Sequence, residues 1–250
     1  MSILNDKTCI ILITGANQGI GFELAKKIAQ DHRDSHVLMG CRNEARGVEA
    51  AATLQKQGLS VEPLQLDVTE DTSIFMASKY VESTFGRLDV LVNNAGIGND
   101  SRLLEVGISA REVYREQFDT NLFGAAQVTE TFTPLLEKST AGARLVFTSS
   151  GLGSLAQRTD SNDHYYSVML PIYRTSKAAL NMLCLHYAVK YKDAGWKVNT
   201  VDPGHVATNL NKFKGPNAVE TGAVQLAHMA MLGPDGPTGT FSNRAGIVPW

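Results

Sequence analysis

Tyr173 and Lys177 form a pair whose residue types and spacing could carry out proton transfer. They lie four positions apart in a stretch with helical periodicity, so both side chains would share one face of a helix. A free tyrosine has a pKa of about 10, and a nearby cation lowers that pKa by favouring the phenolate. The pair could therefore exchange a proton at neutral pH. By itself, the spacing also fits an ordinary pair on a surface helix.

The elements that must position this pair are predicted by alternating apolar runs and helical segments. Strands buried on both faces of a parallel sheet read as near-continuous apolar runs, as Cys9–Ile13 does. Right-handed crossovers would then place helices on both faces. We predict an α/β fold, a doubly wound parallel sheet in a three-layer αβα sandwich, with residues 1–250 as a single domain. The predicted strands cover residues 8–14, 36–41, 59–66, 88–93, 143–149 and 196–201.

A glycine-rich turn follows the first predicted strand. Residues 14–21 read Thr-Gly-Ala-Asn-Gln-Gly-Ile-Gly and precede a helical run. Glycines permit a tight turn and let backbone N–H groups and a helix N-terminus approach a pyrophosphate. The spacing differs from GxGxxG, but its place between strand and helix predicts a phosphate-binding turn. The predicted cofactor-binding residues here are Gly15, Asn17, Gln18, Gly19, Ile20 and Gly21.

The end of the second predicted strand bears on the choice between the two nicotinamide cofactors. An acidic residue at this point accepts a hydrogen bond from the ribose 2′-hydroxyl. This chain has Arg42 instead, with Arg46 one helical turn later. Two guanidinium groups near Asn17 suit a 2′-phosphate, so NADPH or NADP is the predicted cofactor. The alternative is two solvated arginines at a helix start, where cations are unfavourable.

Further motifs follow the remaining predicted strands. They are Leu66–Thr69, Asn93–Gly96, Asn121, Ser149–Ser150, Tyr173–Lys177 and Pro203–Thr208. Together with the glycine turn, this set resembles the short-chain dehydrogenase/reductase superfamily over nearly the whole chain. Residues 14–21, 41–47, 88–97 and 239–250 look most like the carbonyl reductases of that superfamily. The resemblance implies a Rossmann-type fold and an NADPH-dependent oxidoreductase.

The resemblance also implies cofactor contacts for particular residues. Asp67 and Val68 would border the adenine, and Thr208 would hold the nicotinamide carboxamide. Asp67 could instead cap the following helix, for which Thr69 is also available. Lys177 would bind the nicotinamide ribose. Asn93, Ala95 and Gly96 would pass close to the adenosine ribose, and Pro203, Gly204 and Val206 complete the predicted cofactor contacts.

Catalytic roles follow from the same resemblance. Hydride would pass from the nicotinamide C4 to a carbonyl carbon while Tyr173 gives a proton to the developing alkoxide. Ser150 would donate a hydrogen bond to that oxygen. Ser150 fits the family's SxxG turn, and Ser149 remains the alternative. Asn121 would open its helix and hold a water that relays protons to Lys177.

Two segments that do not fit the strand and helix alternation are predicted as loops forming a substrate rim. The loops are Ser154–Leu170 and Ala207–Gly215. With their flanking residues, they give a predicted rim at residues 151–172 and 205–216. Their apolar and aromatic residues favour a hydrophobic ketone, aldehyde or quinone, although such residues also serve to pack a loop down. His205 could equally be structural. The candidate substrate contacts are Leu152, Tyr166, His205 and Leu210, with Tyr165, Met169, Val206 and Phe213 also near the mouth.

Composition excludes other partner classes. The chain has 250 residues, with 23 Lys and Arg against 25 Asp and Glu, and a formal net charge of -2. No broad cationic surface for nucleic acid or an anionic membrane is expected. The apolar run near the start is far shorter than the roughly 20 residues of a membrane span. We expect a cytoplasmic protein acting on a small molecule, and a homodimer or homotetramer by resemblance.

Cysteine and histidine spacing predicts no metal site. Cys9, Cys41 and Cys184 show no paired spacing and are expected to be reduced packing residues. The six histidines form no recognised ligand pattern.

Two rival functions stay open. One is a family member that oxidises an alcohol or catalyses a non-redox step, and the other is a non-enzymatic NADPH-binding regulator.

Overall fold

The strands form one eight-stranded sheet in the order β3-β2-β1-β4-β5-β6-β7-β8. A computed structural model describes residues 7–250. All neighbouring strands are parallel except β8, which is antiparallel to β7. The strands are β1 (Cys9–Thr14), β2 (Ser35–Cys41), β3 (Val61–Gln65), β4 (Val90–Asn93), β5 (Arg144–Thr148), β6 (Lys197–Val201), β7 (Thr240–Asn243) and β8 (Gly246–Ile247).

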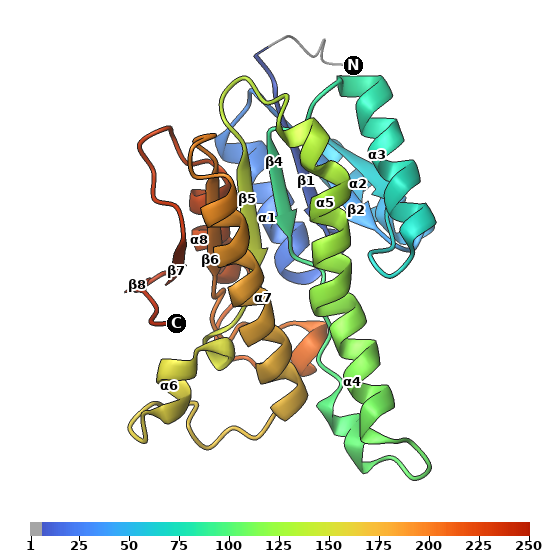
Figure 1. Ribbon diagram of the computed structural model, residues 1–250. Coiled ribbons are helices and arrows are strands. Elements are labelled where there is room, and N and C mark those ends of the chain that lie inside the picture. Colours follow the sequence, from blue (N-terminus) through green and yellow to red (C-terminus); the bar gives the residue numbers. More distant parts are fainter. Residues whose placement is uncertain (1–6) are drawn as a thin grey trace.

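Helices cover both faces of the sheet, so the predicted doubly wound three-layer fold is confirmed (Figure 1). One face packs against α1 (Gly19–Asp31), α2 (Glu44–Gln55) and α8 (Val219–Ala230). The other packs against α3 (Asp71–Phe85), α5 (Ala125–Leu136) and α7 (Pro171–Lys190). Two further helices, α4 (Ala110–Phe118) and α6 (Leu155–Thr159), lie at the end of the molecule where the parallel strands finish.

The alternation of side chains along β1 explains why its sequence is apolar throughout. Ile10 and Leu12 join the core on the α5 side, which includes Phe132. Ile11 and Ile13 join the core on the α1 side. Burying each such side chain contributes about 1.5–3 kcal/mol. The three cysteines are free, and two of them are buried, which agrees with the expected packing role.

The C-terminal part of the chain departs from the predicted pattern. Strands β7 and β8 were not predicted, and the predicted loop Ser154–Leu170 contains the short helix α6. Ser154 Oγ accepts a hydrogen bond from Gln157 N, which caps α6, and donates to the carbonyl oxygen of Pro249 at 2.6 Å. Ala156 N donates to the carbonyl oxygen of Trp250 at 2.9 Å. The C-terminal segment therefore braces the start of this helix.

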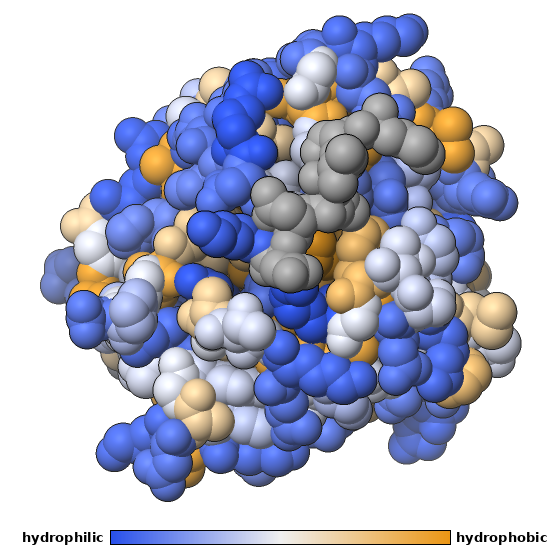
Figure 2. Space-filling view, turned by 90° about the horizontal axis from the view of Figure 1, so that it is seen from above, coloured by the Kyte–Doolittle hydropathy of each residue, from blue (hydrophilic) through white to orange (hydrophobic). Residues whose placement is uncertain are grey.

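Figure 2 shows the end of the molecule opposite to α4 and α6. Hydrophilic residues cover most of this view, and apolar residues form small separate groups among them. Within residues 7–250, no helix combines the length and the apolar character needed to cross a membrane. The polar side chains singled out in the sequence gather instead at the carboxyl ends of the parallel strands.

Candidate active site

The glycine turn lies between β1 and α1, as predicted, and its shape requires glycine. Gly15 has a φ of +66°, a region that L side chains rarely adopt. A Cβ atom on Gly21 would lie only 2.5 Å from the carbonyl oxygen of Gly15. Thr14 Oγ1 accepts hydrogen bonds from Asn94 N and Ala95 N, both at 2.9 Å. The turn is thereby held against the end of β4.

A groove of about 250 Å³ runs along this turn. Asn94 was not predicted to line it. Side chains of successive strand residues point in opposite directions, and Asn93, predicted as a cofactor contact, turns its amide to Thr129 Oγ1 instead. Asn93 therefore lies outside the groove. The predicted residues that line it are Gly15, Asn17, Gln18, Gly19, Ile20, Gly21, Arg42, Asp67, Val68, Ala95, Gly96 and Thr208.

The two predicted arginines are placed differently. Arg42 lines the groove, and Arg46 does not. Helix α2 begins at Glu44 with Asn43 as its N-cap, and Asn43 Oδ1 accepts a hydrogen bond from Arg46 N at 3.0 Å. Arg42 therefore precedes the helix, and the helical spacing that would put both guanidinium groups on one face does not apply.

Asp67 lines the same groove. Its Oδ1 atom accepts hydrogen bonds from Thr69 N and Thr69 Oγ1, at 3.0 and 2.8 Å. Helix α3 begins only at Asp71, with Glu70 as its N-cap. The suggestion that Asp67 or Thr69 caps this helix is therefore wrong, because Asp67 closes a local turn and lies three residues before the N-cap Glu70.

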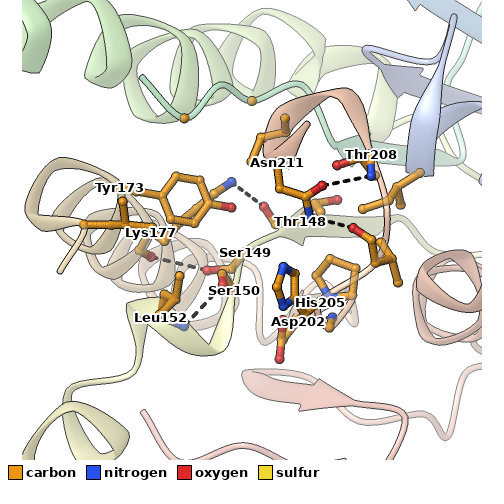
Figure 3. Close-up of a pocket in the computed structure, with 18 of the residues that line it drawn as sticks. Thr148, Ser149, Ser150, Leu152, Tyr173, Lys177, Asp202, His205, Thr208 and Asn211 are labelled. Atoms are coloured by element: carbon orange, nitrogen blue, oxygen red, sulfur yellow. Dashed lines mark hydrogen bonds between the residues drawn. The ribbon is translucent and has the colours of Figure 1, made fainter. Parts of the chain in front are cut away.

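A cavity of about 550 Å³ adjoins the groove and contains the predicted catalytic pair (Figure 3). Lys177 is 3% exposed, and its Nζ atom donates a hydrogen bond to the carbonyl oxygen of Thr148 at 2.8 Å. The same atom lies 5.7 Å from the centre of the Tyr173 ring. Burial lowers the pKa of Lys177 to about 8, so the ammonium form still predominates at neutral pH.

Tyr173 is partly exposed to this cavity. Burial raises the pKa of Tyr173, and the negative charge of Asp202 raises it further, whereas a hydrogen bond with Ser150 opposes both effects. The hydroxyl is therefore protonated at neutral pH in the free protein. It can donate a proton to a group in the cavity.

The two neighbouring serines have different surroundings. Ser149 is buried, and its hydroxyl donates to Asn181 Oδ1 at 2.6 Å, which joins β5 to α7. Ser150 Oγ accepts a hydrogen bond from Leu152 N at 3.2 Å, and its hydroxyl also hydrogen-bonds with the Tyr173 hydroxyl. A Cβ atom on Gly153 would lie 2.8 Å from the backbone carbon of Lys177, so the SxxG turn packs directly on α7. This geometry favours Ser150 as the serine that meets a substrate.

Asp100 positions the helix that carries the catalytic pair. It lies 72 residues before Ile172, whose N–H donates to its Oδ1 atom at 2.9 Å. Tyr173 N donates to its Oδ2 atom at 3.1 Å. The carboxylate therefore caps the N-terminus of α7 from outside the helix, where negative charge is favourable. No local signal in the sequence indicates this contact.

Asn121 lies in a π-helix, Asp119–Gly124, between α4 and α5. Its amide donates to the carbonyl oxygen of Ile97 at 2.9 Å and to Ser176 Oγ at 3.1 Å, and its Oδ1 atom accepts from Ile97 N at 2.8 Å. The helix is thus widened at this residue, as the resemblance implies. The side chain ties the loop after β4 to the helix of Lys177.

The comparisons with known proteins decide the family. A model of the short chain dehydrogenase family matches residues 9–218. The chain belongs to the short-chain dehydrogenase/reductase family. It is 39% identical over 258 residues to a short-chain dehydrogenase/reductase of Stachybotrys chlorohalonatus, covering 95% of this chain and 89% of the relative. It is 31% identical over 286 residues to (+)-neomenthol dehydrogenase of Arabidopsis thaliana, covering 93% and 95%.

A solved structure shows the same fold. The NADPH-bound carbonyl reductase from chicken fatty liver superposes with a TM-score of 0.82 and 25% identity. The match covers 98% of this chain and all of that one. The fold of that reductase therefore extends over 98% of this chain.

The groove and the cavity fit the nicotinamide cofactor that this family binds. They share Ile20, Asn94, Gly96, Thr208 and Leu210, so they form one continuous site. The glycine turn and the N-terminus of α1 face the groove and suit a pyrophosphate. Lys177 at the junction has ammonium hydrogens beyond the one given to Thr148. The residues present could hold a dinucleotide with its reactive end in the cavity.

The loops around the cavity form its outer wall. Arg174 holds the first of them, because its guanidinium donates to the carbonyl oxygens of Val168 at 3.0 Å, Leu152 at 3.2 Å and Tyr165. Asn211 holds the second, accepting from Thr208 N at 3.1 Å and donating to the carbonyl oxygen of Val206 at 2.7 Å. The loop after β6 thus contains a 3₁₀ turn, Asn209–Asn211.

Most predicted rim residues line the cavity. The exceptions are Tyr166, Met169 and Phe213. Tyr166 is 44% exposed, and its ring lies 5.7 Å from the guanidinium carbon of Arg158 outside the cavity. The predicted residues found in the cavity are Leu152, Tyr165, Pro203, Gly204, His205, Val206 and Leu210, and those that were not singled out include Asp100, Val168, Leu170, Asp202, Lys212 and Lys214.

Proposed function

We propose that this protein reduces the carbonyl group of a hydrophobic small molecule with NADPH. One observation carries the proposal: the Tyr173 hydroxyl, the Ser150 hydroxyl and the Lys177 ammonium face a single cavity that continues into the groove of the glycine turn. A carbonyl substrate in this cavity would lie beside Ser150 and Tyr173, with the positive charge of Lys177 next to the Tyr173 ring.

Each of these side chains has a defined task in the reduction. The nicotinamide cofactor, when bound, supplies the hydride. Ser150 donates a hydrogen bond to the carbonyl oxygen and holds it near Tyr173. Tyr173 transfers its proton to that oxygen as negative charge develops there. Lys177 contributes positive charge next to the tyrosine, which stabilises the phenolate left behind.

Arg42 supports NADPH as the cofactor. It follows β2 at the position where an acidic residue would bind a ribose 2′-hydroxyl, and it lines the groove. A guanidinium there can form charge-assisted hydrogen bonds with a 2′-phosphate. The chicken fatty liver reductase is a relative of the same fold with NADPH bound.

The cofactor preference is tested with matched arginine variants. We expect the wild type to show a higher kcat/KM with NADPH than with NADH. Arg42→Ala should lower the NADPH to NADH ratio about tenfold or more, because a contact to the 2′-phosphate is lost. Arg46→Ala is the control and should change that ratio much less. An equal or higher wild-type value with NADH would contradict the proposal.

Apolar side chains from the loops around the cavity support a largely apolar substrate. Leu152, Val168, Leu170, Val206 and Leu210 all border it. A screen of ketones, aldehydes and quinones for NADPH consumption would define the substrate class. Tight NADPH binding with no turnover of any carbonyl would instead favour a regulatory protein.

We also propose that the protein acts in the cytoplasm and associates as a dimer or tetramer through the helices around Asn121 and Tyr173. Met182 and Val189 are 66% and 77% exposed on α7, and Phe123 is exposed next to α5. Light scattering after chromatography should give twice or four times the 27.0 kDa chain mass. Met182→Glu should favour the monomer, and a wild-type monomer would contradict the association.

A further inference from the structure

Asp202 is a second buried carboxylate in the cavity, and the reduction described above assigns it no role. It directly follows β6 and is 8% exposed. Its Oδ1 atom accepts a hydrogen bond from Gly204 N at 3.0 Å. Its Oδ2 atom accepts no hydrogen bond from any residue in the range 7–250. One oxygen of this carboxylate is therefore available to a ligand.

Asp100, the other acidic residue that lines the cavity, differs from Asp202 in its hydrogen bonds. Asp100 is as buried as Asp202, but its two oxygens accept hydrogen bonds from the N–H groups of Ile172 and Tyr173. Its role is to cap α7. Asp202 has no such structural use for its second oxygen.

Another oxygen without a donor lies beside Asp202. A Cβ atom placed on Gly151 would lie 3.3 Å from Asp202 Oδ2 and 2.9 Å from Gln157 Oε1, so both oxygens lie close to Gly151, and of these residues only Asp202 lines the cavity. Gln157 Oε1 is buried and has no hydrogen-bond partner in the described part of the chain. Both atoms are acceptors. Neither atom can supply a hydrogen to the other, so a donor group on a ligand in the cavity could bind Asp202 Oδ2.

Because the Asp202 carboxylate is buried, it matters whether a ligand brings a hydrogen-bond donor to it. An apolar ligand that filled the cavity would exclude water from Asp202 Oδ2 and leave a buried charge without a compensating donor. A ligand with its own O–H or N–H group at this point would replace the hydration of the carboxylate. The cavity therefore discriminates between ligands of similar shape by this one group.

We propose that Asp202 is a specificity-determining residue that accepts a hydrogen bond from a donor group on the carbonyl substrate. This role rests on the carbonyl reduction proposed above. It narrows the substrates to ketones or aldehydes that also carry a hydroxyl or a protonated amine. Asp202, Ser150 and Tyr173 line the same cavity, and Figure 3 shows Asp202 and Tyr173 on opposite sides of Ser150.

The kinetic test uses acetophenones that carry hydrogen, hydroxyl, methoxy or aminomethyl at the meta or para position. For the wild type, we expect kcat/KM with the hydroxyl or aminomethyl ketone to exceed that with the methoxy ketone by about 10- to 100-fold. Asp202→Ala should bring this ratio to within about threefold of unity. The ratio does not depend on the amount of active enzyme, so partial misfolding does not affect it.

Two further variants complete the kinetic test. Asp202→Asn keeps an oxygen acceptor for Gly204 N but places an NH2 donor where Oδ2 faced the ligand and removes the charge, so the preferences for the hydroxyl and for the ammonium should both fall toward unity. Asp193→Ala removes an exposed acid that does not line the cavity and should leave the ratios unchanged. A wild-type ratio near one, or a ratio that Asp202→Ala does not change, would overturn the role of Asp202.

A binding measurement separates this role from the proposed reduction. Dissociation constants of the same ketones are measured by calorimetry with NADP⁺ present, so that no turnover occurs. The donor preference and its loss in Asp202→Ala should appear there as well. Reduction of all four ketones with no donor preference would remove only the role of Asp202. Donor-selective binding without reduction of any carbonyl would remove only the proposed function.

Discussion

The two walls of the substrate cavity are held by different kinds of contact. The inner wall carries Ser150, Tyr173 and Lys177 at the ends of β5 and α7, which are packed into the core of the sheet. The outer wall consists of loops held by side chains that bind backbone carbonyl oxygens, chiefly those of Arg174 and Asn211. The reacting groups therefore lie on the rigid wall, and the wall that selects the substrate can vary without moving them.

The strongest test of the inner wall is Tyr173→Phe. Removal of the hydroxyl takes away the proton donor but leaves the ring, so kcat for carbonyl reduction should fall by roughly 100- to 10,000-fold. The dissociation constant for NADPH, followed by fluorescence, should stay within about threefold. A variant that keeps a tenth of wild-type turnover would show that another group supplies the proton.

The outer wall is tested by Arg174→Met. The variant leaves three backbone carbonyl oxygens without their charged donor, so the free energy of unfolding should fall by about 2–4 kcal/mol. The KM for the carbonyl substrate should rise about tenfold, while the dissociation constant for NADPH changes little. The control is Arg111→Met, at an exposed arginine on α4. Equal losses of NADPH and substrate binding would show that the walls are not independent.

Lys177→Met tests how much the buried Lys177 ammonium lowers the free energy of unfolding. Because burial lowers the Lys177 pKa to about 8, the unfolded chain binds more protons between about pH 8 and 10 than the folded one. The buried ammonium therefore destabilises the fold below pH 8, and this cost disappears as pH rises. At pH 7 the variant should be inactive, and its free energy of unfolding should be about 1–3 kcal/mol higher.

The pH dependence provides the check on Lys177. The stability difference between variant and wild type, measured by urea unfolding, should shrink steadily from pH 7 to pH 10. A difference that grows with pH would mean that the charged lysine stabilises the fold, and that its pKa is raised rather than lowered.

The smallest effect is expected where the outer wall meets the groove. Asn209 Nδ2 donates a hydrogen bond to Gln18 Oε1 at 2.9 Å, and both residues line the groove. Asn209→Ala should weaken NADPH binding about two- to fivefold, because an exposed hydrogen bond contributes little. Gln18→Ala should have the same effect, and the double variant should add nothing further. Additive losses would show that the two side chains act separately.

The sheet and the glycine turn could be predicted because local sequence determines them. Buried parallel strands such as β1 read as apolar runs, and the turn needs glycine at Gly15 and Gly21 for reasons of backbone shape. Strand β7 gave no comparable signal. It has four residues, follows a segment rich in proline and glycine, and is recognisable only from its pairing with β6.

The parts of the site that could not be predicted depend on contacts between distant residues. Asp100 caps α7 across 72 positions, and no local pattern reports this. Asp202 directly precedes Pro203 in the PGxxxT motif, and its second oxygen becomes notable only when its neighbours in space are known. The prediction for Arg46 was wrong because it extended the helical spacing back to Arg42, whereas α2 begins only at Glu44.

The π-helix at Asp119–Gly124 makes α4 and α5 independently variable parts of one long helix. A π-helical turn contains more residues than the 3.6 of an α-helical turn, so the stripe of buried residues on α4 is rotated relative to the stripe on α5. Helix α5 contacts α3 and β4, whereas α4 contacts α7. Segments equivalent to α4 could therefore be exchanged between relatives without repacking the sheet, provided that the wide turn is kept.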